Sequence, residues 1–341
     1  MGFQNIKHKN KNLTIHKSVN NPIFNEKTIL VTSTWDYVDL WLKRANKAKA
    51  RFFWSQARSF YEATQSLPKT SAPLTAYYCF LNATKALLIT KGVQFSDEHG
   101  VTGFSVNNQT SLSNEKVKFK HNGILPALCN LLGEPNNEEI YTLKDLLYNV
   151  PNIHRAFDLT YSSDTELFFP ISEPKIVRSE TSHEAWFCAE FTDKYATQHT
   201  FNKLPAHFER ERSIENKYIV RARRRFRWEP RNVSASLNRY KNYHKRLRKD
   251  LYYINGATRL WYIKRAGNIP GLINRSNITL TFAAMHRLSE LARYTPDKLA
   301  KHFDCQHNWL LSEFITSASN QFIDEISSEL TGHEFMLPGR H

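Results

Sequence analysis

Regularly spaced apolar residues predict a pair of helices near the start of the chain. Apolar residues recur at three- and four-residue steps from residue 35 to residue 67, and Pro68 ends the pattern. A second helical pattern covers residues 74–90, and Gly92 is well placed just past its end. Because only about four residues join the two helices, they must run antiparallel. Residues 31–92 are therefore predicted to form a helical hairpin.

A clear alternation of apolar and basic residues marks the segment 217–228, KYIVRARRRFRW. One side carries Tyr218, Val220, Ala222, Phe226 and Trp228. The other side carries Ile219, Arg221, Arg223, Arg225 and Arg227, and only Arg224 interrupts the apolar row. A period of two predicts a β-strand with one apolar face and one arginine face. Guanidinium groups on such a strand recur about every 7 Å, a spacing that suits successive phosphates.

A basic amphipathic helix is predicted directly after this strand, from Ser236 to about Asn255, with Gly256 as its stop. Its apolar stripe consists of Leu237, Tyr240, His244, Leu247, Leu251 and Ile254. The basic residues lie off that stripe: Arg239, Lys241, Lys245, Arg246, Arg248 and Lys249. If the strand and the helix pack side by side, their basic sides form one surface.

The rest of the chain completes an α+β prediction that is predominantly α-helical. Residues 141–160 predict two helices broken at Pro151, and helices are also predicted at 278–294, 307–318 and 319–331. We therefore expect a helical hairpin, a helical C-terminal region and a minor antiparallel sheet that carries the arginine strand. The predicted segments, within one or two globular domains, are an irregular N-terminal arm (1–30), the hairpin (31–92), a mixed α/β region (93–202), the basic strand-helix segment (203–268) and the C-terminal helical region (269–341).

Positive charge is concentrated in the basic segment. The chain of 341 residues has a formal net charge of +15. Residues 203–268 hold 19 lysines and arginines but only 5 carboxylates, a net charge of +14. Such a local excess is costly in the folded state unless an anionic partner faces it. We therefore predict a nucleic-acid-binding protein. The alternatives are a solvated basic face without a partner and an assembly module that docks an acidic protein.

The predicted nucleic-acid-binding residues come from both elements: Arg221, Arg223, Arg225, Arg227, Lys245, Arg246, Arg248 and Lys249. Aromatic residues are interleaved with them, and exposed rings would stack on unpaired bases, which slightly favours RNA over DNA. About two-thirds of these rings are expected in the core, because helical and period-two spacing already explain their positions. The rings are Phe226, Trp228, Tyr240, Tyr243, Tyr252, Tyr253, Trp261 and Tyr262.

Several protein classes lack their signals in this sequence. The four cysteines are far apart and form no CxxC pair, so we expect reduced thiols in a reducing compartment. No stretch approaches the ~20 apolar residues of a membrane span, and no apolar segment follows the basic N-terminus. A cytoplasmic protein without a membrane partner is therefore expected, and a homodimer is left open. No cofactor or metal is expected, because GxSxG, GxxxxGK[ST], GxGxxG and HExxH are missing and the KHFDCQH run at 301–307 lacks a second ligand group.

Three stretches of the chain carry a family resemblance. They are YYCFLNATKA at 77–86, LLYNVPNIHR at 146–155 and LSELARYTP at 288–296, and they resemble the YaaC-like family of bacterial proteins. The resemblance implies a bacterial cytoplasmic protein and assigns no functional residue. A helical hairpin followed by further helices is also similar, by analogy of fold alone, to the HEPN class of defence ribonucleases.

The HEPN analogy supplies an alternative function, a metal-independent ribonuclease with a role in antiphage defence. HEPN enzymes use an arginine and a histidine four to six residues apart, a spacing that Arg239 and His244 fit. The histidine would act as acid and base, and the arginine would stabilise the phosphorane charge. However, chance alone predicts about three such pairs in this chain. His244 also lies in the apolar stripe, where a core histidine is the ordinary interpretation, so the sequence leaves open whether the protein is an enzyme.

One further pair of residues lies on the helix predicted at 278–294. His286 and Arg293 are seven residues apart, about two turns of helix, and could line a cleft. Residues on a helix surface are the ordinary interpretation of such a pair.

Overall fold

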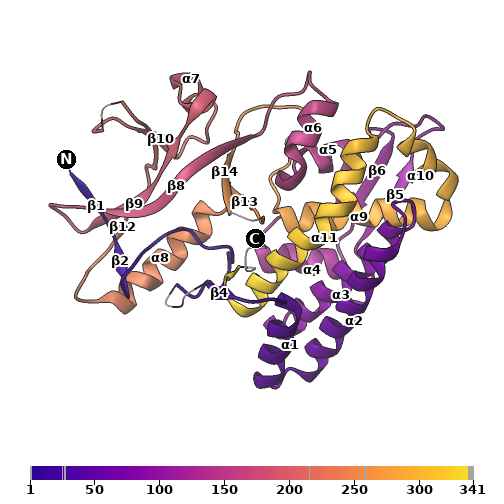
Figure 1. Cartoon of the computed structure of the whole chain (residues 1–341), viewed down its shortest axis with the longest axis horizontal. Helices are drawn as coiled ribbons and strands as arrows, with labels where there is room; N and C mark the ends of the chain where they lie inside the picture. The colour runs from indigo at the N-terminus through magenta and orange to yellow at the C-terminus, as the bar shows by residue number, and fades with distance from the viewer. Residues whose placement is uncertain (1, 25, 27, 215, 257–258, 337–341) are drawn as a thin grey trace. The chain divides into compact units, whose positions relative to one another are not determined.

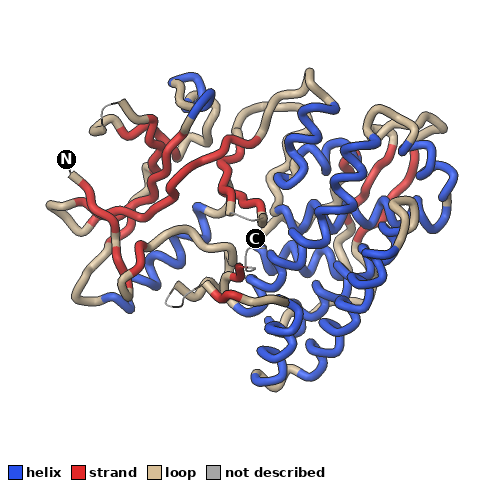
Figure 2. Tube along the Cα trace, viewed as in Figure 1, coloured by secondary structure: helices blue, strands red, loops and turns tan. Residues whose placement is uncertain are grey.

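The computed structural model describes residues 2–24, 26, 28–214, 216–256 and 259–336 (Figure 1). The fold is α+β, as predicted (Figure 2). The chain divides into two compact units, each built from separate stretches of sequence. Unit 1 comprises residues 1–29, 166–269 and 332–334, and unit 2 comprises residues 30–165, 270–331 and 335–341.

Unit 1 is built on a sheet of eight strands, more than the minor sheet that the sequence predicts. The strand order is β10-β11-β9-β8-β14-β13, with β1 paired to β8 and β12 paired to β9, and each of these pairings is antiparallel. The strands are β1 (Phe3–Asn5), β8 (Phe168–Ser179), β9 (Glu184–Phe191), β10 (Phe208–Glu211), β11 (Tyr218–Ala222), β12 (Phe226–Arg227), β13 (Leu251–Ile254) and β14 (Leu260–Lys264).

The remaining elements of unit 1 are short except for one helix. They are the hairpin strands β2 (Lys7–His8) and β3 (Lys11–Asn12), the 3-10 turn η2 (Asp193–Tyr195), and the helices α7 (Gln198–Phe201) and α8 (Val233–Leu247). Helix α8 lies beside the sheet in Figure 1. Its apolar stripe packs into the same hydrophobic cluster as the inner faces of the strands.

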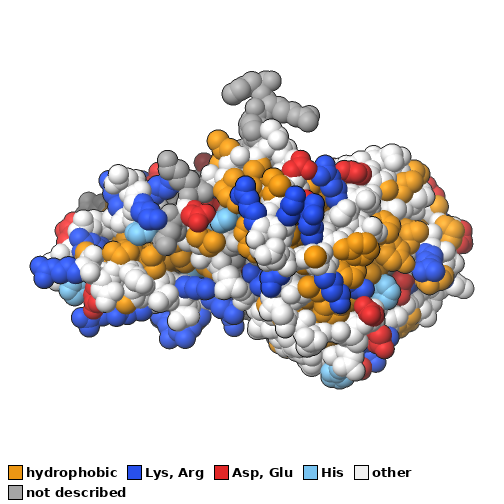
Figure 3. Space-filling view, turned by 90° about the horizontal axis from the view of Figure 1, so that it is seen from below, with side chains coloured by type: hydrophobic (Ala, Val, Ile, Leu, Met, Phe, Trp, Pro, Cys, Tyr) orange, Lys and Arg blue, Asp and Glu red, His pale blue; other side chains and the backbone are white. Residues whose placement is uncertain are grey.

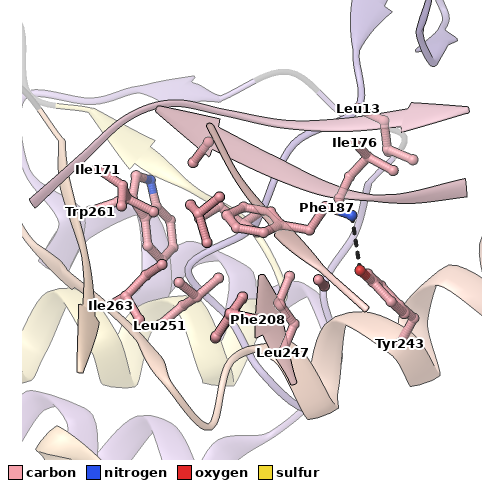
Figure 4. Close-up of a cluster of buried hydrophobic side chains, with 14 of the residues drawn as sticks. Leu13, Ile171, Ile176, Phe187, Phe208, Tyr243, Leu247, Leu251, Trp261 and Ile263 are labelled. Atoms are coloured by element: carbon pink, nitrogen blue, oxygen red, sulfur yellow. Dashed lines mark hydrogen bonds between the residues drawn. The ribbon is translucent and has the colours of Figure 1, made fainter. Parts of the chain in front are cut away.

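The core of unit 1 shows why the sheet and α8 hold together (Figure 4). Phe187 of β9 and Leu247 of α8 are both buried in one cluster. The backbone N–H of Phe187 donates a hydrogen bond of 2.9 Å to the hydroxyl of Tyr243 on α8. Burying a tyrosine requires a partner for its hydroxyl, and this bond provides one while joining helix to sheet. The helix is thereby fixed with one side toward the strands and the other toward solvent.

The arginine-rich segment forms two strands instead of the one that the sequence predicts. Arg221 of β11 is opposite Cys188 of β9, and Phe226 of β12 is opposite Ala185. More residues therefore lie between these pairs on the arginine side than on the β9 side, so the chain bulges at residues 223–225. The predicted faces are nevertheless confirmed, since the residues expected on the apolar side join or pack against the core cluster.

The predicted helix at 236–255 is wrong in its second half. Helix α8 ends at Leu247, and Leu251–Ile254 forms β13. The sequence of β13, LYYI, consists of aromatic and aliphatic residues that favour strands. In β13, which pairs with β14 so that Tyr252 is opposite Tyr262, Leu251, Tyr252 and Tyr253 are buried.

Unit 2 is mainly helical, and the predicted hairpin is present as α2 and α3. The helical stretch predicted to begin at residue 35 is split in two, because Asn46 adopts a left-handed conformation with φ of 53° between α1 and α2. The two C-terminal helices predicted at 307–318 and 319–331 are one helix, α11. The helices are α1 (Thr34–Arg44), α2 (Ala48–Ser66), α3 (Ala72–Lys91), α4 (Ile124–Leu132), α5 (Leu143–Tyr148), η1 (Pro151–Ile153), α6 (His154–Thr160), α9 (Asn277–Tyr294), α10 (Pro296–Phe303) and α11 (Asn308–Thr331).

A small antiparallel sheet packs with these helices, in the order β5-β6-β7. Its strands are β5 (Val101–Ser105), β6 (Glu115–Phe119) and β7 (Ile140–Thr142), and a separate two-stranded ribbon joins β4 (Ile29–Leu30) to β15 (Phe335–Met336). None of the described helices is long and apolar enough to cross a membrane.

A buried charged pair connects the small sheet to α9. Nε of Arg287 on α9 donates a hydrogen bond of 3.0 Å to Oε2 of Glu115 on β6, and both side chains are less than 10% exposed. Nε2 of His302 on α10 lies 3.7 Å from the other oxygen of Glu115. Burial raises the pKa of Glu115, but the contacts from His302 and Arg287 outweigh that effect and hold the pKa below its usual value. Glu115 is therefore a buried carboxylate that depends on its cationic partner.

Candidate nucleic-acid interface

Helix α8 separates a buried side from a solvent side cleanly. Asn232 caps its N-terminus by accepting a hydrogen bond of 3.2 Å from the N–H of Ala235. The buried residues, at helical spacing, are Ser236, Tyr240, Tyr243, His244 and Leu247. The exposed residues are Ser234, Asn238, Asn242, Lys245 and Arg246. The helix contains no aspartate or glutamate, so its solvent side offers only cations, amides and a hydroxyl.

Three cations at the C-terminal end of α8 are exposed: Lys245, Arg246 and Lys249. Lys245 and Arg246 lie in the last turn of α8, and Lys249 lies in the turn that follows, where its backbone N–H donates a hydrogen bond of 3.3 Å to the carbonyl of Arg246. The three residues therefore occupy the same end of the helix. Each lies beyond ion-pair distance of every carboxylate in the part of the chain that the structure describes. The negative end of the helix dipole favours cations here, but it leaves these charges open to solvent. We call these three residues the α8 cations.

Arg248, which was predicted to bind nucleic acid, instead stabilises unit 1 through bonds to the backbone. Its guanidinium donates hydrogen bonds to the carbonyl oxygens of His16 (3.1 Å) and Lys17 (3.0 Å) and also bonds the carbonyl of Leu251. The same group lies 5.0 Å from the ring centre of Trp261. These contacts fasten the N-terminal segment to the end of α8 and occupy the donors that a phosphate would need.

The four strand-segment arginines that were predicted to bind nucleic acid face solvent as predicted, but each has a carboxylate partner. Arg221 contacts Glu209 at 2.8 Å and Glu211 at 2.6 Å. Burial lowers the pKa of Arg221, yet the two carboxylates outweigh it, so the pKa lies above its usual value. Arg223 lies 3.3 Å from Glu209 as well. One acidic strand, β10, therefore neutralises much of this end of the arginine row.

The other two predicted arginines are also paired. Arg225 forms an ion pair with Glu184 of β9, and its guanidinium lies 5.1 Å from the ring centre of Trp186. Nε of Arg227 lies 2.5 Å from Oε1 of Glu229. The structure therefore does not bring the strand arginines and the α8 cations together as one uniformly free cationic surface.

Most of the net charge of the protein nevertheless resides in unit 1. Its residues include 27 lysines and arginines and 13 carboxylates, a net charge of +14, whereas unit 2 carries +1. Lys and Arg side chains gather along the lower edge of the left part of Figure 3, where unit 1 lies. Arg224 in the bulge and Arg231 before α8 are exposed and, within the described chain, unpaired. Sequence reasoning missed both, although Arg224 was the one break in the alternation.

The structure does not bring the candidate catalytic pair together. His244 is fully buried, and its Nε2 accepts a hydrogen bond of 3.0 Å from the backbone N–H of His16. Arg239 lies on another side of α8, where it donates to the carbonyl of Arg227 and approaches Glu229 at 3.6 Å. Burial holds the pKa of His244 well below its usual value, so this imidazole is neutral and out of reach of solvent. The core interpretation of His244 therefore fits its surroundings.

The interleaved aromatic residues offer little surface for stacking on bases. Seven of the eight are buried, and only Phe226 is half-buried, packed at 4.8 Å between ring centres against Tyr243. Contacts through phosphates, without base stacking, are what this surface can provide. Among the described residues, no group of three or more His, Cys, Asp or Glu side chains is placed to hold a metal ion.

Comparison with known proteins gives one match. The family model described as YaaC-like Protein matches residues 16–330, which is most of the chain. No curated protein and no solved structure matches the chain.

Proposed function

The chain belongs to the YaaC-like protein family, and we propose that this protein binds nucleic acid through the solvent side of α8. The α8 cations provide the charge, and the exposed Ser234, Asn238 and Asn242 provide neutral donors along the same helix. Side chains of these kinds are the usual partners of phosphate oxygens. Arg224 and Arg231 add free charge from the neighbouring loops.

One observation carries this proposal: α8 contains no carboxylate and its cations are unpaired, whereas the four arginines predicted to bind from the strand segment are all paired. Glu209, Glu184 and Glu229 neutralise the strand arginines, whereas nothing among the described residues neutralises the α8 cations. Unpaired neighbouring cations repel each other and are favoured when an anion faces them. A helix of 15 residues is about 22 Å long, enough to follow about six phosphates of one strand.

The buried aromatics define what kind of binding to expect. Without stacking or base-edge contacts, affinity comes from phosphate contacts and the release of counterions. Such binding depends steeply on salt and only weakly on base sequence. The slight preference for RNA expected from the sequence therefore has little support at this surface, and RNA and DNA should bind with similar affinity.

Fluorescence anisotropy with labelled oligonucleotides tests the proposal. Single-stranded RNA, single-stranded DNA and duplex DNA of equal length are titrated with the full chain at about 50 mM salt and above. We expect all three to bind at low salt, to differ by less than about tenfold, and to dissociate as salt rises. An absence of binding at low salt would contradict the proposal and favour an acidic protein as the partner of this face. Affinity that does not change with salt would also contradict it.

A further inference from the structure

A second candidate site lies in unit 2, remote in sequence from α8. It is a pocket of about 360 Å³ between α3, the loop before β5, the end of β6 and α9. Its volume falls in the range of small-molecule sites, about 300–1,000 Å³. The residues that carry its chemistry are Tyr77, His99, Lys120, His286, Glu290 and Arg293.

Three rings pack against one another in this pocket. The ring centres of Tyr77 and His286 are 4.8 Å apart, those of Tyr77 and His99 are 5.4 Å apart, and those of the two histidines are 5.5 Å apart. The hydroxyl of Tyr77 forms a hydrogen bond with Nδ1 of His99. Burial raises the pKa of Tyr77, so the phenol keeps its proton. In the tautomer in which this phenol donates to Nδ1, His99 carries its own proton on Nε2, where it can serve as a donor to a ligand.

His286 is a buried polar group that the protein leaves unsatisfied. The side chain is nine-tenths buried, and its Nδ1 has no hydrogen-bond partner among the described residues. The nearest carboxylate oxygen, on Glu290, is 3.7 Å away, too long for a hydrogen bond. Native proteins rarely leave buried polar groups unpaired, and this one belongs to a residue that lines the pocket.

Backbone hydrogen bonds to α4 and to Lys120 hold the loop that carries His99 in place. The carbonyls of Glu98 and His99 accept hydrogen bonds of 2.9 and 3.2 Å from the first N–H groups of α4, and Gly100 accepts one of 3.0 Å from Lys120. A Cβ on Gly123 would lie 2.5 Å from the Cα of Gly100, so only glycine permits this close approach. A ring fixed in this way is preorganised for binding.

The pocket is lined by charges of both signs, because Glu98 and Glu290 line it together with Arg293 and Lys120, and the two cations are the groups that can hold an anion. Arg293 and Lys120 are exposed, and no described carboxylate lies within ion-pair distance of either. Burial is the largest cause that lowers the pKa of His99, and the charges of Lys85, Arg293 and Lys120 lower it further. The positive charges of Arg293 and Lys120 therefore act on the pocket. Glu290, by contrast, is already occupied, because it accepts hydrogen bonds of 3.1 Å from Gly103 and from Arg287.

The pocket also has aromatic walls. Tyr78 and Tyr294 line it, and the ring of Tyr294 is 68% exposed. The guanidinium of Arg293 lies 5.1 Å from the centre of that ring. An exposed ring beside a free arginine combines a stacking surface with a phosphate ligand.

We propose that this pocket binds a mononucleotide, with the phosphate between Arg293, Lys120 and the Nε2–H of His99 and the base against the tyrosines. The site goes beyond nucleic-acid binding by α8 and does not depend on it. Guanidinium and ammonium groups attract the negative charge of the phosphate, and a hydrogen bond from the imidazole orients the phosphate in the pocket.

Isothermal titration calorimetry with AMP and adenosine tests this proposal on the full chain. AMP is expected to bind at millimolar or lower concentration, and adenosine at least about tenfold more weakly, because it lacks the phosphate. Arg293→Gln and Lys120→Gln, both at exposed positions, should each weaken AMP binding at least about fivefold. Lys301→Gln, which removes an exposed cation of α10 outside the pocket, should leave it unchanged.

The results that would overturn the site are distinct from those that concern α8. Adenosine binding as tightly as AMP, no AMP binding at millimolar concentration, or equal effects of Arg293→Gln and Lys301→Gln would each overturn it. A variant in which the α8 cations are replaced by glutamate should bind AMP like the unmodified protein. Loss of AMP binding in that variant would place the nucleotide on α8 and overturn the pocket.

Discussion

Replacing the three α8 cations together, in the variant Lys245→Glu/Arg246→Glu/Lys249→Glu, is expected to weaken nucleic-acid binding at least about 100-fold at 0.1 M salt. Each phosphate contact contributes about 0.7 log units at this salt for single strands and about 0.9 for duplex DNA. Three contacts therefore account for about 2 to 2.7 log units, and repulsion from the new carboxylates adds to the loss. Anisotropy titrations of the variant and the unmodified protein measure the difference directly.

The matched control for this variant is Lys43→Glu/Arg44→Glu/Lys47→Glu. These cations are exposed, two of them lie in the last turn of a helix as Lys245 and Arg246 do, and the change in net charge is identical. The two substitutions in the last turn of each helix incur a similar cost against the helix dipole, a few tenths to about 1 kcal/mol per charge, whereas Lys47 is the N-cap of α2, where the dipole favours a carboxylate. The control should lose less than about threefold in affinity. Equal losses in the two variants would mean that net charge, and not α8, governs binding.

The largest effect on stability is expected from Arg287→Met. This change leaves Glu115 as a buried carboxylate without its cation, a situation that typically costs about 3–5 kcal/mol of unfolding free energy. It also removes the 3.1 Å hydrogen bond from Arg287 to Glu290, which lines the pocket. Chemical denaturation monitored by circular dichroism measures the loss.

The same substitution at a surface pair provides the control. Arg51 makes two hydrogen bonds, of 2.8 and 2.9 Å, to Asp39, but its side chain is 44% exposed. Arg51→Met should therefore cost far less than Arg287→Met, because an exposed ion pair contributes little to stability. The double variant Arg287→Met/Glu115→Leu should be more stable than Arg287→Met alone, because no unpaired charge remains. If Arg287→Met and Arg51→Met cost the same, the buried pair does not hold the small sheet to α9.

The basic segment shows what alternation predicts and what it does not. The period of two placed Val220 and Trp228 in the core and Arg223 at the surface. The burial of the first two and the exposure of the third confirm this. It could not reveal the ion pairs, because Glu184 and Glu209 come from neighbouring strands and meet the arginines only through sheet pairing. Glu229 is the exception, since it follows Arg227 by two residues and was visible in the sequence.

Helix α8 shows how a correct pattern can be extended too far. The spacing from Tyr240 to Leu247 identified the buried stripe and correctly placed His244 in it. Leu251 and Ile254 continue the same spacing, but they lie in β13 because pairing with β14 outweighs local helix propensity. The run of aromatic residues in this segment was the available sign of a strand.

The pocket in unit 2 could be anticipated only in part. His286 and Arg293 were recognisable as two residues that could line a cleft, because both lie on one helix. Tyr77, His99 and Lys120 come from three other segments, and only the tertiary structure brings them to that helix. Neither their spacing nor their composition signals a site in the sequence.

The central claim, that the α8 cations contact phosphates, is tested most directly by the salt dependence of binding. The variant Lys245→Ala/Arg246→Ala/Lys249→Ala removes three contacts without adding repulsion. The slope of log K against log salt should become shallower than that of the unmodified protein by about 2 for single strands and about 2.7 for duplex DNA. Equal slopes for the two proteins would contradict the claim, whatever the change in affinity.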